Sequence, residues 1–109
     1  MSAKILQVNF KLNVASAEYQ SLCQALAETF AKIPGLHWKV WILNEGEREA
    51  GGVYLFESEQ ALHDYLSGPL AAQVASHPAL RDISVKTFDV MDGVTAITRG
   101  PVAVAAAAG

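Results

Sequence analysis

Hydrophobic and polar positions alternate at both ends of the chain with the period of two that is typical of β-strands. The first such segment is Lys4–Leu12 and the last is Ile83–Met91. Between them, residues 36–43 and 52–56 are rich in β-branched and aromatic side chains and flank the turn-prone residues 44–46. We expect these two inner segments to form a β-hairpin.

Helical spacing of apolar residues appears twice. After Ser16, a predicted N-cap, apolar side chains recur every three or four positions until Pro34-Gly35 ends the pattern. Ser58 is predicted to cap a second, shorter helix, which Gly68-Pro69 interrupts and restarts. Pro78 is predicted to end this helical region. The repeating side chains of the first helix are Tyr19, Leu22, Cys23, Leu26, Phe30 and Ile33.

The predicted order is strand, helix, strand, strand, helix, strand. This order is typical of the ferredoxin-like βαββαβ arrangement, an α+β fold in which both helices cover one face of an antiparallel sheet. We expect a single domain over residues 1–99, followed by a flexible Ala-rich tail over residues 100–109.

Both faces of the predicted sheet carry large apolar side chains. Trp38 and Trp41 have opposite parity in one strand, so one indole must point to each face. Because two helices cover only one face, the other face would expose an apolar patch to water. We therefore predict a homodimer in which the uncovered faces of two sheets pack together.

Charge and composition exclude several classes of protein. Eight Lys and Arg against eleven Asp and Glu give a net charge of −3, and the cations are dispersed along the chain, which argues against nucleic acid as a partner. The longest apolar run is far shorter than the roughly 20 residues that span a bilayer, so we expect no membrane insertion. The start of the chain lacks the apolar region of an export signal, and we expect a cytoplasmic protein.

The hairpin carries a more specific pattern. The run from Pro34 to Trp41, followed by Glu49–Phe56, resembles the YdhR-type putative monooxygenase family of the dimeric α+β barrel superfamily. The likeness extends to Gln7 and Phe10 in the first strand and to residues 86–90 in the last. The resemblance implies a ferredoxin-like homodimer that encloses a pocket.

Lys39 is the main candidate for chemistry, because it shares a strand face with Trp41. An amine beside an indole can lose part of its hydration, which would lower its pKa and make it a base or an anchor for a phenolate. The alternative is a solvated Lys whose stem lies along apolar surface. Tyr54 is a candidate hydrogen-bond donor, and Trp41, Trp38 and Phe56 are candidate pocket walls, with a purely structural role in the core as the alternative for the tryptophans and for Tyr54.

Polar residues on the other strands complete the candidate site. Glu49 begins the third strand and is predicted to pair with Lys39 or Lys86, either in the site or only as a hairpin ion pair. Gln7 and Asn9 project from one face of the first strand. They are predicted to contact substrate, with Gln7 as a candidate donor to oxygen, or else to bond each other or the dimer partner.

The sequence shows no metal-binding spacing of His and Cys, no GxGxxG motif and no P-loop, so we predict neither a metal nor another cofactor. With the resemblance, this favours a cofactor-independent monooxygenase that oxidises a small aromatic or quinol-type substrate with molecular oxygen. A non-catalytic dimer that binds a small hydrophobic molecule is the alternative. A haem-degrading enzyme is a third candidate, for which only Asn9 fits.

Overall fold

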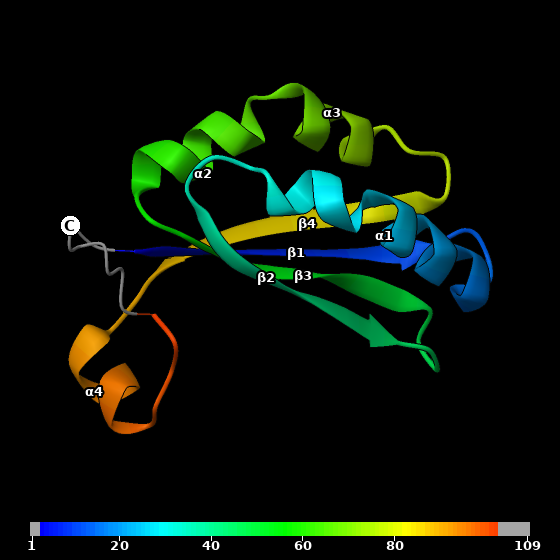
Figure 1. The fold of residues 1–109 in the computed structure, drawn as a ribbon. Helices are drawn as coiled ribbons and strands as arrows, with labels where there is room; N and C mark the ends of the chain where they lie inside the picture. The colour runs from blue at the N-terminus through cyan, green and yellow to red at the C-terminus, as the bar shows by residue number, and fades with distance from the viewer. Residues whose placement is uncertain (1–2, 103–109) are drawn as a thin grey trace.

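The computed structural model describes residues 3–102. The elements in chain order are β1 (Lys4–Leu12), α1 (Ser16–Ala31), β2 (Leu36–Asn44), β3 (Glu49–Phe56), α2 (Glu59–Leu66), α3 (Pro69–Ala75), β4 (Leu80–Asp89) and α4 (Asp92–Ile97). The strands form one antiparallel sheet in the order β2-β3-β1-β4. Helices α1, α2 and α3 lie on one side of this sheet, as Figure 1 shows. This is the predicted ferredoxin-like α+β fold.

Local signals place most of the element boundaries correctly. β1 spans the predicted residues, Ser58 accepts a hydrogen bond from the Ala61 N–H at the start of α2, and Pro69 begins α3. Ser16 was predicted to cap α1, and this is wrong: Ala15 is the N-cap, while the Ser16 hydroxyl donates to the Glu45 carboxylate. β3 begins at Glu49, as predicted for the third strand, whereas the last strand was predicted over Ile83–Met91 and spans Leu80–Asp89.

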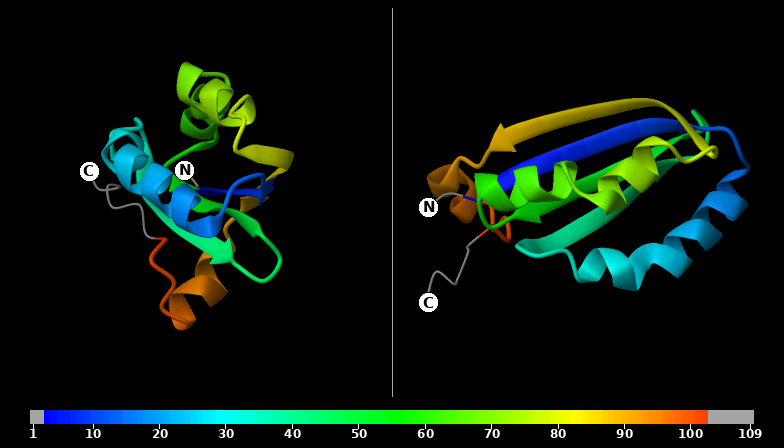
Figure 2. Two further views of the ribbon diagram at one scale, coloured as in Figure 1. Left: turned by 90° about the vertical axis from the view of Figure 1, so that its right-hand side faces the viewer. Right: turned by 90° about the horizontal axis from the view of Figure 1, so that it is seen from above.

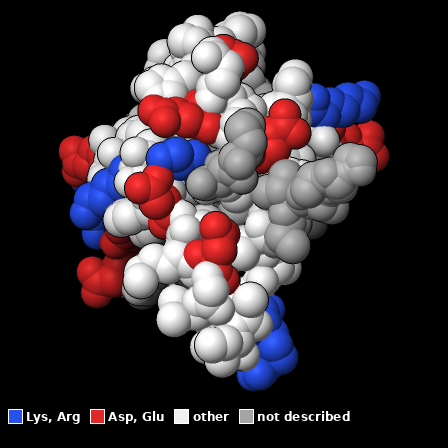
Figure 3. All heavy atoms as spheres, turned by 90° about the vertical axis from the view of Figure 1, so that its left-hand side faces the viewer, with Lys and Arg blue, Asp and Glu red and all other residues white. Residues whose placement is uncertain are grey.

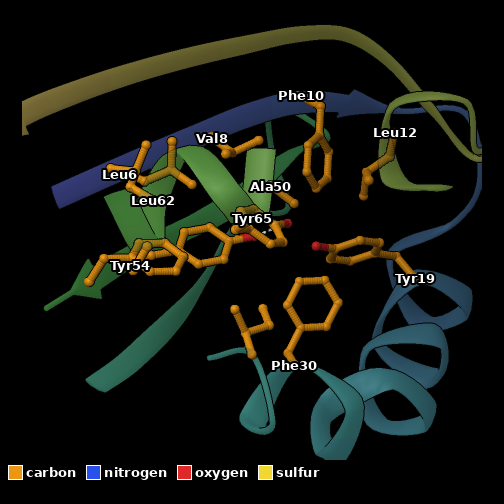
Figure 4. Packing of buried hydrophobic residues seen from close by; sticks show 13 residues of the cluster. Leu6, Val8, Phe10, Leu12, Tyr19, Phe30, Ala50, Tyr54, Leu62 and Tyr65 are labelled. Carbon is orange, nitrogen blue, oxygen red and sulfur yellow. Dashed lines mark hydrogen bonds between the residues drawn. The ribbon is translucent and has the colours of Figure 1, made fainter. Parts of the chain in front are cut away.

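The main core lies between the sheet and the three helices that cover it. Leu6, Val8, Phe10 and Leu12 project from β1 toward α1 and α2, and each is almost fully buried. Tyr19 and Phe30 reach this core from α1, and Tyr65 reaches it from α2 (Figure 4). In Figure 2, α1 lies along the β2 edge of the sheet, whereas α2 and α3 run over its centre.

The opposite face of the sheet, called here the helix-free face, carries Ile5, Trp38, Val40, Val53, Leu55 and Phe88. Helix α4, which the sequence did not predict, follows β4 and lies on this side (Figure 1). The Trp38 indole N–H donates to the Pro101 carbonyl oxygen over 2.8 Å. A residue near the end of the described chain therefore contacts Trp38 on the helix-free face.

The predicted tail is described only in part. Residues 100–102 are included, and Pro101 contacts Trp38, whereas residues 103–109 lie outside the described residues. The domain boundary at residue 99 stays a prediction. No helix in the described part of the chain is long and apolar enough to span a membrane.

Surface charges form small separate groups. The end of the molecule seen in Figure 3 carries acidic and basic side chains that lie beside one another in small groups rather than in one basic stripe. Several charges are paired across strands, as in the ion pair between Lys4 and Asp89 and that between Lys11 and Glu49. The expectation that nucleic acid is not a partner stays a prediction.

Candidate active site

A cavity of about 450 Å³ lies between the sheet and helices α1 and α3. Its floor is formed by β1, β2 and β3, and its walls come from α1, α3 and the segment that follows α3. Most of its surface is aromatic or aliphatic. This size and lining are typical of pockets that hold small organic molecules. The lining residues used below are Tyr19, Cys23, Phe30, Lys39, Trp41, Tyr54 and His77.

Lys39 lies on the cavity floor within a group of aromatic rings. Its Nζ is 3.4 Å from the centroid of Trp41, 3.7 Å from that of Phe30 and 4.7 Å from that of Tyr54. Strand pairing produces this arrangement, because Lys39 is opposite Tyr54 and Trp41 is opposite Gly52 in the β2–β3 ladder. Within residues 3–102, no carboxylate forms an ion pair with Nζ.

Two effects compete at the Lys39 amine. The aromatic faces attract an ammonium, typically by about 0.5–2 kcal/mol. Loss of hydration favours the neutral amine. Burial is the larger effect and lowers the pKa of Lys39 from 10.5 to about 7, although the nearby Cys23 thiol partly opposes this shift. A shift of this size corresponds to roughly 5 kcal/mol, which exceeds the cation–π attraction. Near neutral pH, Lys39 therefore holds comparable amounts of amine and ammonium.

Tyrosine hydroxyls border the same space. Tyr54 on β3 and Tyr65 on α2 share a hydrogen bond of 3.4 Å between their hydroxyl oxygens. Burial raises the pKa of Tyr54 well above its ordinary value and also raises the pKa of Tyr19. Both phenols are therefore protonated throughout the neutral range and can donate hydrogen bonds. Figure 4 shows Tyr19 pointing from α1 toward the same region, above Phe30.

The structure brings together only three of the predicted site residues in this cavity: Lys39, Trp41 and Tyr54. Four others lie on the helix-free face: Gln7, Asn9, Trp38 and Lys86. The Gln7 side-chain amide donates to the Asn9 side-chain oxygen over 2.9 Å, so these two residues bond each other. Strand parity separates these four residues from the cavity, and whether any of the predicted site residues contacts a substrate stays a prediction.

The remaining two candidates also lie outside the cavity lining. Phe56 is fully buried and stacks on Tyr54 and Tyr65, with ring centroids 6.0 and 5.7 Å away. It therefore packs against the cavity residue Tyr54 without lining the cavity itself. Glu49 was predicted to pair with Lys39 or Lys86, and this is wrong. Its Oε1 lies 3.6 Å from Nζ of Lys11, its cross-strand partner in β1.

Sequence reasoning missed several cavity residues. Tyr19, Cys23 and Phe30 were predicted only as the apolar stripe of α1, and His77 had no assigned role. The apolar stripe of α1 indicated that these side chains are buried but not that they line a pocket. The His77 Nδ1 accepts a hydrogen bond from the Ala79 N–H over 3.1 Å. A neutral His77 therefore carries its proton on Nε2.

Within residues 3–102, no three His, Cys, Asp or Glu side chains converge in a way that would hold a metal ion. The prediction of a protein without a metal or other cofactor stays a prediction.

Comparison with protein families gives one match that covers most of the chain. The model of the family described as "Putative mono-oxygenase ydhR" matches residues 5–101. No curated protein matches the chain.

Solved structures with a similar fold include proteins of different described functions. A protein of unknown function from Nitrosomonas europaea, NE2512, has 15% identity and a TM-score of 0.69, covering 84% of this chain and 91% of that one. A mutant of the cofactor-independent oxygenase SnoaB from Streptomyces nogalater has 17% identity and a TM-score of 0.68, covering 84% and 95%. The heme-degrader MhuD from Mycobacterium tuberculosis has 22% identity and a TM-score of 0.63, covering 80% and 95%.

Proposed function

Because this chain belongs to the ydhR family of putative mono-oxygenases, we propose that it oxidises a small aromatic or quinol-type molecule with molecular oxygen, without a cofactor. The observation that carries the proposal is the position of Lys39, whose amine lies among three aromatic rings on the floor of an apolar cavity. The likeness to SnoaB, described as a cofactor-independent oxygenase, supports the same reaction class.

The electrons for such a reaction come from the substrate. Oxygen reacts slowly with closed-shell molecules, but an electron-rich phenolate can pass electrons to it directly. In the overall reaction, one oxygen atom enters the substrate and the other leaves as water, and the substrate supplies all the electrons that reduce both atoms. The protein must therefore favour the phenolate, exclude water and stabilise charge that develops on oxygen.

The cavity residues divide these tasks. Lys39, as a neutral amine, accepts the phenol proton, and the resulting ammonium then lies beside the phenolate. Trp41 and Phe30 hold the aromatic ring by stacking. The Tyr54 hydroxyl, which stays protonated, donates a hydrogen bond toward oxygen. Gln7 has no part in this assignment, because it lies on the helix-free face and is bonded to Asn9.

Lys39→Met tests the role of the amine. The substitution keeps an unbranched apolar stem and removes the base and charge, so oxygen uptake with an active quinol should fall by roughly 10- to 100-fold, the loss expected for one charge-assisted interaction. The matched control is Lys32→Met, which removes an exposed Lys at the end of α1, outside the cavity lining. Equal activity of Lys39→Met and the wild type would remove Lys39 from the mechanism.

A non-catalytic ligand-binding dimer remains the alternative, because the same cavity would hold a small hydrophobic molecule. Trp41 reports on both cases, since its indole lines the cavity. Saturable quenching of Trp fluorescence by a panel of quinols, with neither oxygen uptake nor any product by mass spectrometry, would favour the binding module over the enzyme. Oxygen consumption in step with product formation would favour the enzyme.

We also propose that the protein is a homodimer through its helix-free face. Phe88 and Val40 on this face are 47% and 51% exposed, and Met91, Val94 and Ile97 extend the apolar surface through α4. In an isologous contact the same surface of each subunit packs against its copy, so one contact would cover the apolar faces of both subunits. Such a contact needs about 800 Å² from each subunit to be stable.

The dimer prediction has an internal control on β4. Phe88→Glu places a charge on the helix-free face and should yield monomers at micromolar concentration in light scattering. Val85 is similarly exposed, at 49%, but lies on the opposite face of the same strand, so Val85→Glu should remain dimeric. A wild-type protein that is monomeric at this concentration would contradict the proposal.

A further inference from the structure

We propose that Lys39 also acts as a nucleophile, capturing small aromatic aldehydes in the cavity as an imine. This reactivity goes beyond oxygenation and does not depend on it. Covalent capture needs a neutral amine, a space beside it for the carbonyl compound and limited access of water. The cavity provides each of these for Lys39.

The amine has the surroundings of a nucleophile rather than those of a structural ion-pair partner. Its Nζ contacts the faces of Trp41 and Phe30, and no acidic side chain among residues 3–102 neutralises it. An ammonium without a carboxylate partner in an apolar cavity loses hydration that aromatic faces replace only in part. The lowered pKa of Lys39, about 7, agrees with this geometry.

Gly52 gives the amine its position. A Cβ at Gly52 would lie 2.7 Å from Cε and 3.6 Å from Nζ of Lys39, so the lysine side chain occupies the space that any other residue would fill. The β2–β3 ladder places Gly52 opposite Trp41, next to the Lys39–Tyr54 pair. The glycine therefore lets the amine lie flat on the cavity floor, with the cavity volume above it.

The reaction balances without a co-reactant. The Lys39 lone pair attacks the carbonyl carbon, and a proton moves from nitrogen to oxygen to give a carbinolamine. Loss of the hydroxyl group as water then leaves the C=N bond. Tyr54, whose ring lies beside Nζ and whose raised pKa keeps it protonated, is the candidate proton donor to the departing hydroxyl. Neither oxidation nor reduction occurs.

The titratable groups that face Lys39 come from four parts of the chain. Tyr19 and Cys23 from α1, Tyr54 from β3 and His77 from the segment after α3 line the cavity, and Tyr65 from α2 lies behind Tyr54 and contacts its ring. The two tyrosines with strongly raised pKa values, Tyr19 and Tyr54, do not titrate near pH 7. Imine formation should rise with pH through the region near pH 7 as Lys39 loses its proton.

The test uses the wild-type protein under anaerobic conditions, with benzaldehyde as the probe and sodium cyanoborohydride to reduce the imine to a stable N-benzyl amine. Peptide mapping then locates the modification and separates Lys39 from the other amines of the chain. At pH 7 we expect Lys39 to be modified at least 100-fold faster than the exposed Lys32, because Lys39 is about half neutral there whereas ordinary lysines hold only about 0.04% neutral amine. Toluene, which matches the ring but has no carbonyl, should slow the modification of Lys39 and leave that of Lys32 unchanged.

Two outcomes would overturn the proposal: equal modification of Lys39 and Lys32, or modification of Lys39 that toluene does not affect. Gly52→Ala gives a second, independent measurement, because it displaces the Lys39 side chain without removing the amine; selectivity for Lys39 should fall at least 10-fold. Unchanged selectivity in this variant would show that the position of the amine is not what activates it. Oxygen plays no part in the imine trapping, so the trapping experiment and the oxygen-uptake assay can fail independently of each other.

Discussion

Gly51→Ala should destabilise the protein by about 3 kcal/mol, which corresponds to a fall in Tm of roughly 10–20 °C for a chain of this size. The reason is a backbone overlap. A Cβ at Gly51 would overlap the carbonyl oxygen of Val8 and would also lie too close to the Val8 carbonyl carbon and the Asn9 Cα. These are main-chain atoms of the central strand β1, so no rotamer change relieves the overlap. The β1–β3 ladder itself would have to separate.

Two other glycine variants provide controls. Gly93→Ala in α4 meets no atom within 4 Å, so it should leave Tm unchanged or raise it slightly through better helix propensity. Gly52→Ala, the neighbour of Gly51, meets mainly the flexible end of Lys39 and should cost much less than Gly51→Ala. Thermal unfolding followed by circular dichroism measures all three. A Gly51→Ala variant with the Tm of Gly93→Ala would show that β1 and β3 tolerate the wider separation.

The strand and helix pattern could be predicted from the sequence because each signal is local. Alternation over Lys4–Leu12 and the Ser58 cap depend only on neighbouring residues, and both are confirmed. Helix α4 was missed because its six residues include Gly93 and the β-branched Val94 and Thr95, which give no amphipathic repeat. Ser16 was misassigned because its hydroxyl bonds Glu45 in the β2–β3 turn, a contact between distant parts of the chain.

The site was predicted only in part, and the reason is strand parity. Parity correctly groups Lys39 with Trp41 and separates both from Trp38. Parity does not say which face the helices cover when both faces of the sheet are apolar. Both faces are apolar here, because Leu6 and Tyr54 lie on one face and Leu55 and Phe88 lie on the other. Gln7 and Asn9 were therefore joined to a pocket on the far side of the sheet. Phe30 completes the aromatic group around Lys39, and its distance from Lys39 is fixed only by tertiary packing.

Lys39 should make the stability of the wild-type protein rise with pH between about pH 7 and 10. Burial lowers the pKa of Lys39 to about 7 in the folded state, whereas the unfolded chain has the ordinary value of 10.5. Between these values the unfolded state binds more protons than the folded state, so the free energy of unfolding increases with pH, by at most about 1.4 kcal/mol per unit. Below pH 7 both states are protonated, and the folded protein carries the full cost of the buried charge.

Lys39→Met removes that cost and should therefore be the more stable protein at neutral pH. We expect its free energy of unfolding at pH 7 to exceed the wild-type value by about 3 kcal/mol. The full pKa shift of Lys39 corresponds to roughly 5 kcal/mol, and the cation–π contacts of the wild type reduce this difference. The difference should shrink steadily toward pH 10. Urea denaturation at half-unit pH steps measures it, and the series stops near pH 10, where unfolded tyrosines ionise while the raised pKa keeps Tyr54 protonated in the folded state. Lys32→Met, an exposed control, should follow the wild-type curve. A constant difference between wild type and Lys39→Met at every pH would mean that the amine is hydrated in the folded protein, and both the base and the nucleophile assigned to it would then lose their physical basis.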